Sequence, residues 1–368
     1  MALPLAAMVA LCIAWSGFWF FAASRADTAI AGWRAREAQG GRVQSCSSQS
    51  LGGFPFRIEV QCADPAVEFR GTQPPMVLTA KSAQVAGQIY SPTLLIGEFT
   101  GPLTLAERGR APSLSANWRL AQMSVRGTPE APERASLAVD APELALAGRG
   151  TMETVATAAH VEFHGRIAGG SVADHPILET VVRLEKLSAP AFHPAIARPT
   201  DGEIEATLVG LRNFAPKAWP DRLREIAADN GRIEIRRARL VQDDILIVGA
   251  GSLSLTPAGL PNGQIDITVV GLDKLVTLLG VDQFVQRYLA QRGNGLDMNQ
   301  IAGGLDRILP GLGSALRNNS GGLATIGIAV LGEPRDVEGR KGISLPLRFR
   351  DGAMFLGPVP IGQAAPLF

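Results

Sequence analysis

Apolar and polar residues alternate along much of the chain between residues 42 and 210. From 113 to 120, Leu114, Ala116, Trp118 and Leu120 are each preceded by a polar residue. A period of two places one set of side chains on a buried face and the other in water, which is typical of an antiparallel sheet. Further strands are predicted at residues 82–90, 93–99, 135–139, 144–148, 160–167, 178–187, 232–241, 244–255, 264–270, 323–330, 343–350 and 352–355.

Three other segments have a helical pattern. They predict helices at residues 216–229, 272–291 and 301–318. Asn262-Gly263 predicts a tight hairpin turn between two of the strands. Helical insertions near 216 and 272 follow blocks of strands, and this loose repetition indicates two similar halves that divide near residues 210–230.

The pattern as a whole predicts an α+β fold that is mainly β. We expect one long, curved, mostly antiparallel sheet with a few packed helices, preceded by one N-terminal transmembrane helix. A sheet that curls without closing leaves a groove, and a groove of Leu, Val and Ala side chains would hold acyl chains. Alternatively, the helices cover that face and fill the core.

The first segment is continuously apolar. Residues Ala2 to Ala23 contain no charge, and about 20 apolar residues cross the roughly 30 Å hydrocarbon layer of a bilayer. Aromatic residues crowd its second half, where they would meet the membrane surface; they include Trp15, Trp19, Phe20 and Phe21. We predict a retained anchor over residues 1–24, with a signal peptide cleaved near Ala22-Ala23-Ser24 as the alternative. A separate juxtamembrane helix is expected at residues 25–41, capped by Asp27.

Two observations disagree about the side of the membrane on which the body lies. Arg25, Arg34, Arg36 and Arg42 follow the anchor, and basic flanks favour the cytoplasm. Against this, a hairpin centred on residue 54 would bring Cys46 and Cys62 opposite each other, close enough for a disulfide. A disulfide persists in an oxidising compartment. We therefore expect residues 42–368 to form a β-rich body in the periplasm, although two unrelated thiols remain the alternative.

The amino-acid composition argues against a nucleic-acid-binding function. The chain has 368 residues and a net charge of +1, with 46% hydrophobic and 19% charged residues. A balanced charge argues against a nucleic-acid partner, which requires a basic face. Part of the hydrophobicity belongs to the anchor, while 41 glycines and 25 prolines fit many short strands and turns.

No signature of a catalytic site stands out. The chain has neither a phosphate-binding loop nor a nucleophile elbow. His160, Glu162 and His164 would project from one strand face, so a metal-dependent hydrolase is conceivable. A polar face in contact with water is the simpler interpretation, and we expect no enzyme activity, no metal and no cofactor.

The segment Ser50-Leu51-Gly52-Gly53-Phe54-Pro55-Phe56-Arg57, followed by Cys62 and Pro65, resembles a known family. So do Ile89-Tyr90-Ser91-Pro92 and the ending Asp351-Gly352 with Leu356-Gly357-Pro358-Val359-Pro360. The family is an uncharacterised group of proteobacterial membrane-anchored proteins, domain of unknown function 2125. The resemblance extends over nearly the whole chain. It implies an inner-membrane anchor and a periplasmic body, and it supplies no catalytic residues.

In architecture alone, the chain more distantly resembles the envelope proteins grouped with AsmA, which have roles in lipid transport and envelope assembly. These observations predict a single-pass inner-membrane protein without enzyme activity. It would bind phospholipid or another amphiphile in a sheet groove, in maintenance of the cell envelope. The alternative is a scaffolding protein that docks an envelope protein through its strand edges or helices.

Overall fold

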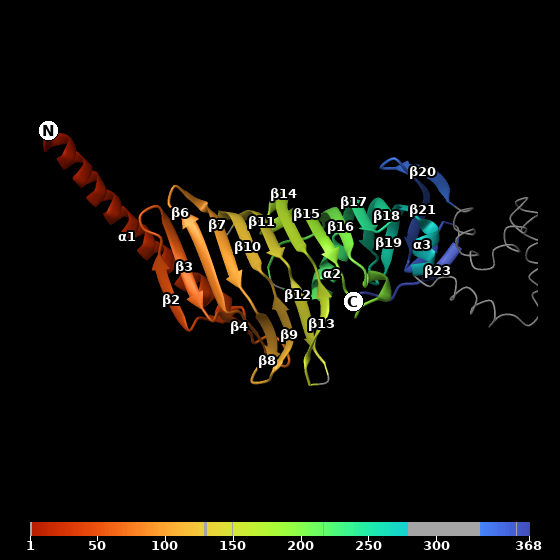
Figure 1. Ribbon diagram of the computed structural model, residues 1–368, viewed down its shortest axis with the longest axis horizontal. Coiled ribbons are helices and arrows are strands. Elements are labelled where there is room, and N and C mark those ends of the chain that lie inside the picture. Colours follow the sequence, from red (N-terminus) through yellow and green to blue (C-terminus); the bar gives the residue numbers. More distant parts are fainter. Residues whose placement is uncertain (1, 129–130, 149, 216, 279–331, 358) are drawn as a thin grey trace, which may run out of the picture. The chain divides into compact units, whose positions relative to one another are not determined.

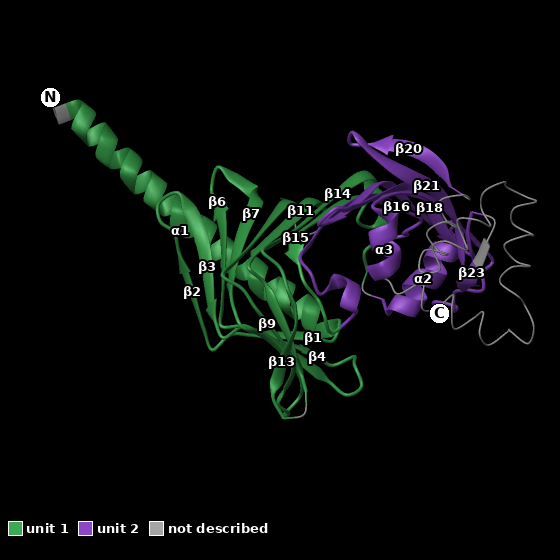
Figure 2. Ribbon diagram, turned by 45° about the vertical axis from the view of Figure 1, so that its right-hand side comes forward, with its two compact units in different colours: residues 1–191, 213–216 green, residues 192–212, 217–368 purple. Residues whose placement is uncertain are grey.

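In the computed structural model, the described residues are 2–128, 131–148, 150–215, 217–278, 332–357 and 359–368. They form two compact units, drawn in different colours in Figure 2. Unit 1 comprises residues 1–191 and 213–216, and unit 2 comprises residues 192–212 and 217–368. Antiparallel strands dominate both units, which confirms the predicted, mainly β fold class. The similarity of two halves stays a prediction.

Helix α1 (Ala2–Gln39) is a single uninterrupted helix. Figure 1 shows its N-terminal half projecting beyond the strands of unit 1. The expected separate helix after residue 24 is therefore the second half of α1. Asp27 lies inside it and accepts a hydrogen bond from Gln49 at 3.4 Å instead of capping a new helix. The helix stops before Gly40-Gly41, where Gly41 has a φ of 79°, which a glycine adopts without strain.

The main sheet of unit 1 has the strand order β2-β3-β6-β7-β10-β11-β14-β15. The strands are β2 (Ser48–Gly52), β3 (Arg57–Ala63), β6 (Ser82–Gln88), β7 (Ser91–Thr100), β10 (Leu120–Thr128), β11 (Ala131–Asp140), β14 (His160–Ser171) and β15 (Asp174–Leu187). Each strand is antiparallel to the next, and side chains along each strand point alternately to the two faces.

A second, seven-stranded sheet continues these strands in the order β1-β4-β5-β8-β9-β12-β13. Its members are β1 (Arg42–Ser45), β4 (Ala66–Phe69), β5 (Met76–Thr79), β8 (Leu103–Glu107), β9 (Pro112–Asn117), β12 (Glu143–Ala147) and β13 (Met152–Thr157). The predicted strand at 113–120 is wrong in its length, because the chain changes sheets at Trp118. There, Trp118 donates its Nε1–H to the carbonyl of Phe99 at 2.8 Å, and β10 begins only at Leu120.

Unit 2 contains a sheet in the order β16-β17-β18-β19-β21-β22-β23, with β20 paired to β21. Its strands are β16 (Thr200–Val209), β17 (Arg232–Gln242), β18 (Ile245–Leu255), β19 (Pro261–Val270), β20 (Glu333–Val337), β21 (Arg340–Arg350), β22 (Ala353–Leu356) and β23 (Val359–Gln363). Its short helices are η1 (Pro194–Ile196), α2 (Trp219–Ala228) and α3 (Leu272–Leu278). The predicted helix at 272–291 begins as expected, while its remainder, the helix at 301–318 and the strand at 323–330 lie outside the described residues.

The hairpin turn predicted at Asn262-Gly263 is wrong in its position. Asn262-Gly263 lies within β19, because the turn is formed earlier: Thr256 donates to the carbonyl of Leu260 at 2.8 Å, and Gly259 has a φ of 76°. A second tight turn, between β21 and β22, is formed by Asp351-Gly352, which the sequence singles out only as part of the family resemblance. Both residues have positive φ, 49° and 83°, as a two-residue turn of this kind requires.

A buried carboxylate ties α2 to the segment that precedes it in the sequence. Glu225 is 6% exposed and accepts hydrogen bonds from Lys217, from Arg222 at 2.8 Å and from the backbone N–H of Arg212 at 3.0 Å. Burial raises the pKa of Glu225, but these donors outweigh it and lower the pKa to about 2. Glu225 is therefore ionised at neutral pH and anchors the helix.

Candidate functional site

One face of the main sheet of unit 1 is apolar from strand to strand. Residues paired across seven strands form a row that we call the central row: Val60, Val85, Gly97, Met123, Leu137, Phe163 and Val182. A second row of the same face runs parallel to it: Cys62, Ala83, Phe99, Ala121, Val139, Val161 and Leu184. The pairing thus produces a broad apolar surface, built from the alternation that the sequence shows.

This apolar face is incompletely covered. Leu137 and Phe163 lie in the middle of their strands, yet they are 36% and 38% exposed, and Leu95 of the same face is 36% exposed. Gly97 is the one buried residue of the central row, and its other six members are half-buried or exposed. An extended exposed apolar surface marks a site of association with a ligand, a membrane or another protein.

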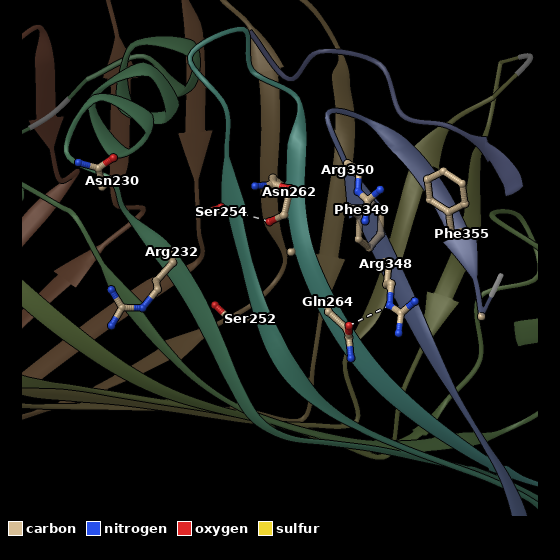
Figure 3. A pocket seen from close by; sticks show the side chains of 12 residues that line it. Asn230, Arg232, Ser252, Ser254, Asn262, Gln264, Arg348, Phe349, Arg350 and Phe355 are labelled. Carbon is tan, nitrogen blue, oxygen red and sulfur yellow. Dashed lines mark hydrogen bonds between the residues drawn. The ribbon is translucent and has the colours of Figure 1, made fainter. Parts of the chain in front are cut away.

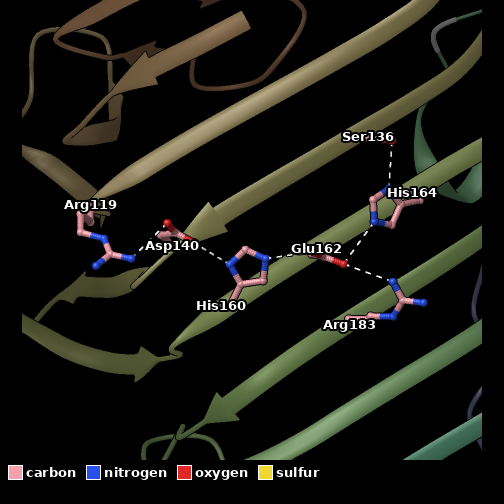
Figure 4. A network of polar contacts seen from close by, with 7 residues as sticks. All are labelled: Arg119, Ser136, Asp140, His160, Glu162, His164 and Arg183. Atoms are coloured by element: carbon pink, nitrogen blue, oxygen red, sulfur yellow. Dashed lines mark hydrogen bonds and ion pairs between the residues drawn. The ribbon is translucent and has the colours of Figure 1, made fainter. Parts of the chain in front are cut away.

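The opposite face of the same strands is polar. Figure 4 shows its centre, where His160 lies between two carboxylates: its Nδ1 is 2.6 Å from Asp140 and its Nε2 is 3.1 Å from Glu162. Glu162 also contacts His164 at 3.3 Å and Arg183 at 3.3 Å. The structure therefore brings together the three residues proposed as metal ligands, but as partners of one another.

The electrostatics of this network favour ion pairing. Hydrogen bonds to Asp140 and Glu162 raise the pKa of His160 above its ordinary value. Hydrogen bonds from His160 and Arg119 lower the pKa of Asp140, and those from His164 and His160 lower the pKa of Glu162. Within the part of the chain that the structure describes, no group of three His, Cys, Asp or Glu side chains has the arrangement of a metal site.

The disulfide forms, though not through the predicted register. Cys46 and Cys62 are bonded with a Cα–Cα distance of 5.5 Å. In β2 and β3, however, Gln49 lies opposite Cys62, so the hairpin is displaced by three residues and Cys46 lies in the loop before β2. The displacement follows from the turn at Gly53, whose carbonyl accepts a hydrogen bond from the N–H of Arg57 at 3.0 Å.

An aromatic cluster joins α1 to the loop between β2 and β3. We call residues 53–56 the Gly-Phe-Pro loop. Trp15 donates to the carbonyl of Pro55 and Trp19 donates to the carbonyl of Arg57, each at 2.9 Å. The rings of Trp19 and Phe54 are 5.5 Å apart and perpendicular. Sequence reasoning singled out the anchor aromatics and the loop separately, but no signal along the chain shows that they touch.

The remaining predicted motif residues differ in their surroundings. Gly53 has a φ of 96°, and a Cβ added there would lie 2.6 Å from the carbonyl oxygen of Arg57, so the position requires glycine. Pro92 is exposed near the start of β7. Of the anchor residues, Phe20 and Phe21 are 66% and 58% exposed, as expected for side chains that would meet lipid.

Unit 2 contains a depression of about 900 Å³, shown in Figure 3. Arg232, Arg348 and Arg350 line it together with hydroxyl and amide side chains and the rings of Phe349 and Phe355, and no carboxylate is among the lining residues. Arg348 donates to the side-chain oxygen of Gln264 at 3.0 Å, and Arg232 pairs with Glu234 at 2.6 Å. Its guanidinium groups are suited to bind an anion.

Helix α1 is long and apolar enough to cross a membrane. A comparison with curated proteins gives no match. A family model described as an uncharacterized protein conserved in bacteria, DUF2125, matches residues 19–365. That match extends from the anchor aromatics through the Gly-Phe-Pro loop and both units to the last strand, and the chain therefore belongs to the DUF2125 family.

Proposed function

We propose that this protein is a non-enzymatic envelope protein, anchored in the inner membrane by α1, that binds phospholipid acyl chains on the apolar face of unit 1. The observation that carries the proposal is the incomplete cover of the central row. Leu137 and Phe163 are more than a third exposed at mid-strand, where a filled core would bury them. An acyl chain laid along the row would remove that surface from water.

The central row begins beside α1, and this supports a lipid as the ligand. Its first strand, β3, follows the loop that contacts Trp15 and Trp19, and each further strand leads away from α1 in the pairing order. A lipid leaving the membrane beside α1 would therefore meet the apolar face of unit 1 at its β3 end.

Native mass spectrometry of the full chain, released from mild detergent, tests this function. We expect phospholipid bound to the wild type and its loss in Leu137→Glu/Phe163→Glu. Gln122→Glu/Ser136→Glu is the matched control on the polar face of neighbouring strands, and it should retain the lipid. Circular dichroism checks that both variants are folded. A wild type without lipid would overturn the proposal.

The periplasmic position of the body is part of the proposal, supported by the Cys46–Cys62 disulfide, because such bonds persist in oxidising compartments. Alkaline phosphatase fused after Phe368 should be active in cells, whereas a fused reporter that works only in the cytoplasm should be inactive. The opposite result would place the body in the cytoplasm.

A scaffolding role is the second candidate. Trp219, at the start of α2, is 76% exposed, and an exposed tryptophan is a frequent anchor of protein interfaces. Crosslinking in membranes that recovers one stoichiometric protein and no lipid would favour this role over lipid binding.

A further inference from the structure

We infer that the Gly-Phe-Pro loop is inserted into the bilayer beside α1, with a row of arginines behind it on lipid phosphates. The inference rests on the proposed membrane anchor. It goes beyond the anchor because it places one end of the strands of the main sheet, the end that carries the Gly-Phe-Pro loop, in the bilayer. Four observations support it: the depth of the loop contacts along α1, the pairing of the loop's backbone, the exposed tyrosine of the neighbouring turn, and the arginines of the adjoining strands.

Depth follows from helix geometry. Polar sequence resumes at Arg25, while the loop contacts Trp19 and Trp15. At 1.5 Å per residue, these two lie about 9 and 15 Å before Arg25 along the helix. The headgroup layer on each side of a bilayer is only about 5–8 Å thick. If the apolar run crosses the membrane, a loop that reaches Trp15 passes through the headgroups.

The loop is suited to an apolar medium. Phe54 and Phe56 contact Trp19 and Trp15 through their rings, yet they are 53% and 62% exposed. Backbone carbonyls exposed to lipid are costly unless they are paired. Here, Gly53 accepts from Arg57 at 3.0 Å, Phe56 accepts from Ile89 at 3.1 Å, and Pro55 accepts from Trp15. Proline also lacks an N–H that would need a partner.

The turn between β6 and β7 lies at the same end of the sheet as the Gly-Phe-Pro loop. Antiparallel pairing places the β6–β7 turn beside the Gly-Phe-Pro loop, and the bond from Ile89 to Phe56 joins them. Tyr90 in that turn is 70% exposed. Tyrosine is enriched at membrane–water interfaces, so its position at this edge matches the inserted phenylalanines.

Arginines follow on the polar face at this end of the strands. Arg126 lies opposite Arg134, and Arg134 lies opposite Arg166, on β10, β11 and β14. Arg166 pairs with Glu179 at 2.5 Å. Like charges directly opposite each other are destabilising. An anionic phosphate between Arg126 and Arg134 would offset that repulsion, and arginine binds phosphate through its planar guanidinium.

The test uses the full chain in nanodiscs of phosphatidylcholine, in a Cys12→Ser background that keeps the disulfide. A polarity-sensitive fluorophore is attached at Phe56→Cys or Tyr90→Cys. Ile13→Cys reports the anchor, and Thr151→Cys, at the far end of the second sheet, reports water. We expect blue-shifted emission and quenching by spin-labelled lipid at positions 13, 56 and 90, and neither at 151.

Quenching at 13 with a water-like signal at 56 and 90 would overturn the insertion and leave the anchor intact. A water-like signal at 13 as well would refute the anchor and the insertion together. For the arginines, added phosphatidylglycerol should increase quenching at 56. The increase should be lost in Arg126→Gln/Arg134→Gln but kept in Arg108→Gln/Arg110→Gln, and an equal increase in both would exclude the phosphate contact.

Discussion

At the scale of single residues, two ionisable side chains, His160 and Glu225, are each surrounded by hydrogen-bonding partners. His160 lies between two carboxylates on the polar sheet face, and Glu225 lies among three donors beside α2. The partners of each group favour its charged form, raising the pKa of His160 and lowering that of Glu225. The pH dependence of stability distinguishes their contributions, because His160 loses its charge as the pH rises and Glu225 loses its charge as the pH falls.

His160 should stabilise the fold in mild acid. Because its pKa is raised above the ordinary value of 6.5, its contribution is fully present below about pH 6.5 and is lost as the pH rises through the folded pKa. In thermal unfolding, His160→Gln should lower the melting temperature at pH 6 more than at pH 9. His175→Gln, exposed at the start of β15, is the control. A difference that grows with pH would contradict the ion pairing.

Glu225 should act in the opposite direction. Its folded pKa of about 2 lies below the ordinary 4.5, so its contribution is present above about pH 4.5 and disappears as the pH falls toward 2. Glu225→Gln leaves Lys217 and Arg222 without their carboxylate, and should cost about 3–5 kcal/mol in free energy of unfolding at pH 7. Urea titrations at pH 7 and pH 3 measure it, with exposed Glu333→Gln as control. An equal loss at both pH values would refute the low pKa.

At the scale of elements, the Cys46–Cys62 bond ties the β1–β2 loop to β3. It closes a loop with a sequence separation of 16, and in the chain-entropy model such a closure is worth about 3 kcal/mol. Cys46→Ala/Cys62→Ala should lose about that amount in urea unfolding, while Cys12→Ala should lose little. A double variant as stable as the wild type would mean that the bond does not restrain the unfolded chain.

The sequence predicts elements better than their pairing. Alternation identifies most strands of the main sheet and the faces of residues such as Phe163 and Glu162, because the period of two is local. Register depends on turns and partners distant in sequence, so the β2–β3 pairing differs by three residues from the prediction, and Asn262-Gly263 lies within a strand. For the same reason, the central row and the contact of Trp15 with Pro55 become visible only in three dimensions.

At the scale of the whole molecule, the two units present different chemistry. Unit 1 carries the apolar helix α1 and the open apolar face, while unit 2 carries a depression lined by Arg232, Arg348 and Arg350. The central claim concerns unit 1: its apolar face holds lipid in the cell. If the claim holds, lipid contacts the apolar face of these strands and not their polar face. A general loss of stability would affect both faces alike and could not produce that difference.

Photo-crosslinking in living cells measures that difference most directly. A benzophenone amino acid at Phe163 or Leu137 would lie on the apolar face, and one at Gln122 would lie on the polar face of the adjacent β10. The account predicts that irradiation attaches phospholipid to the protein at positions 163 and 137 but not at 122. Equal lipid attachment at all three positions, or attachment only of protein at 163 and 137, would contradict it.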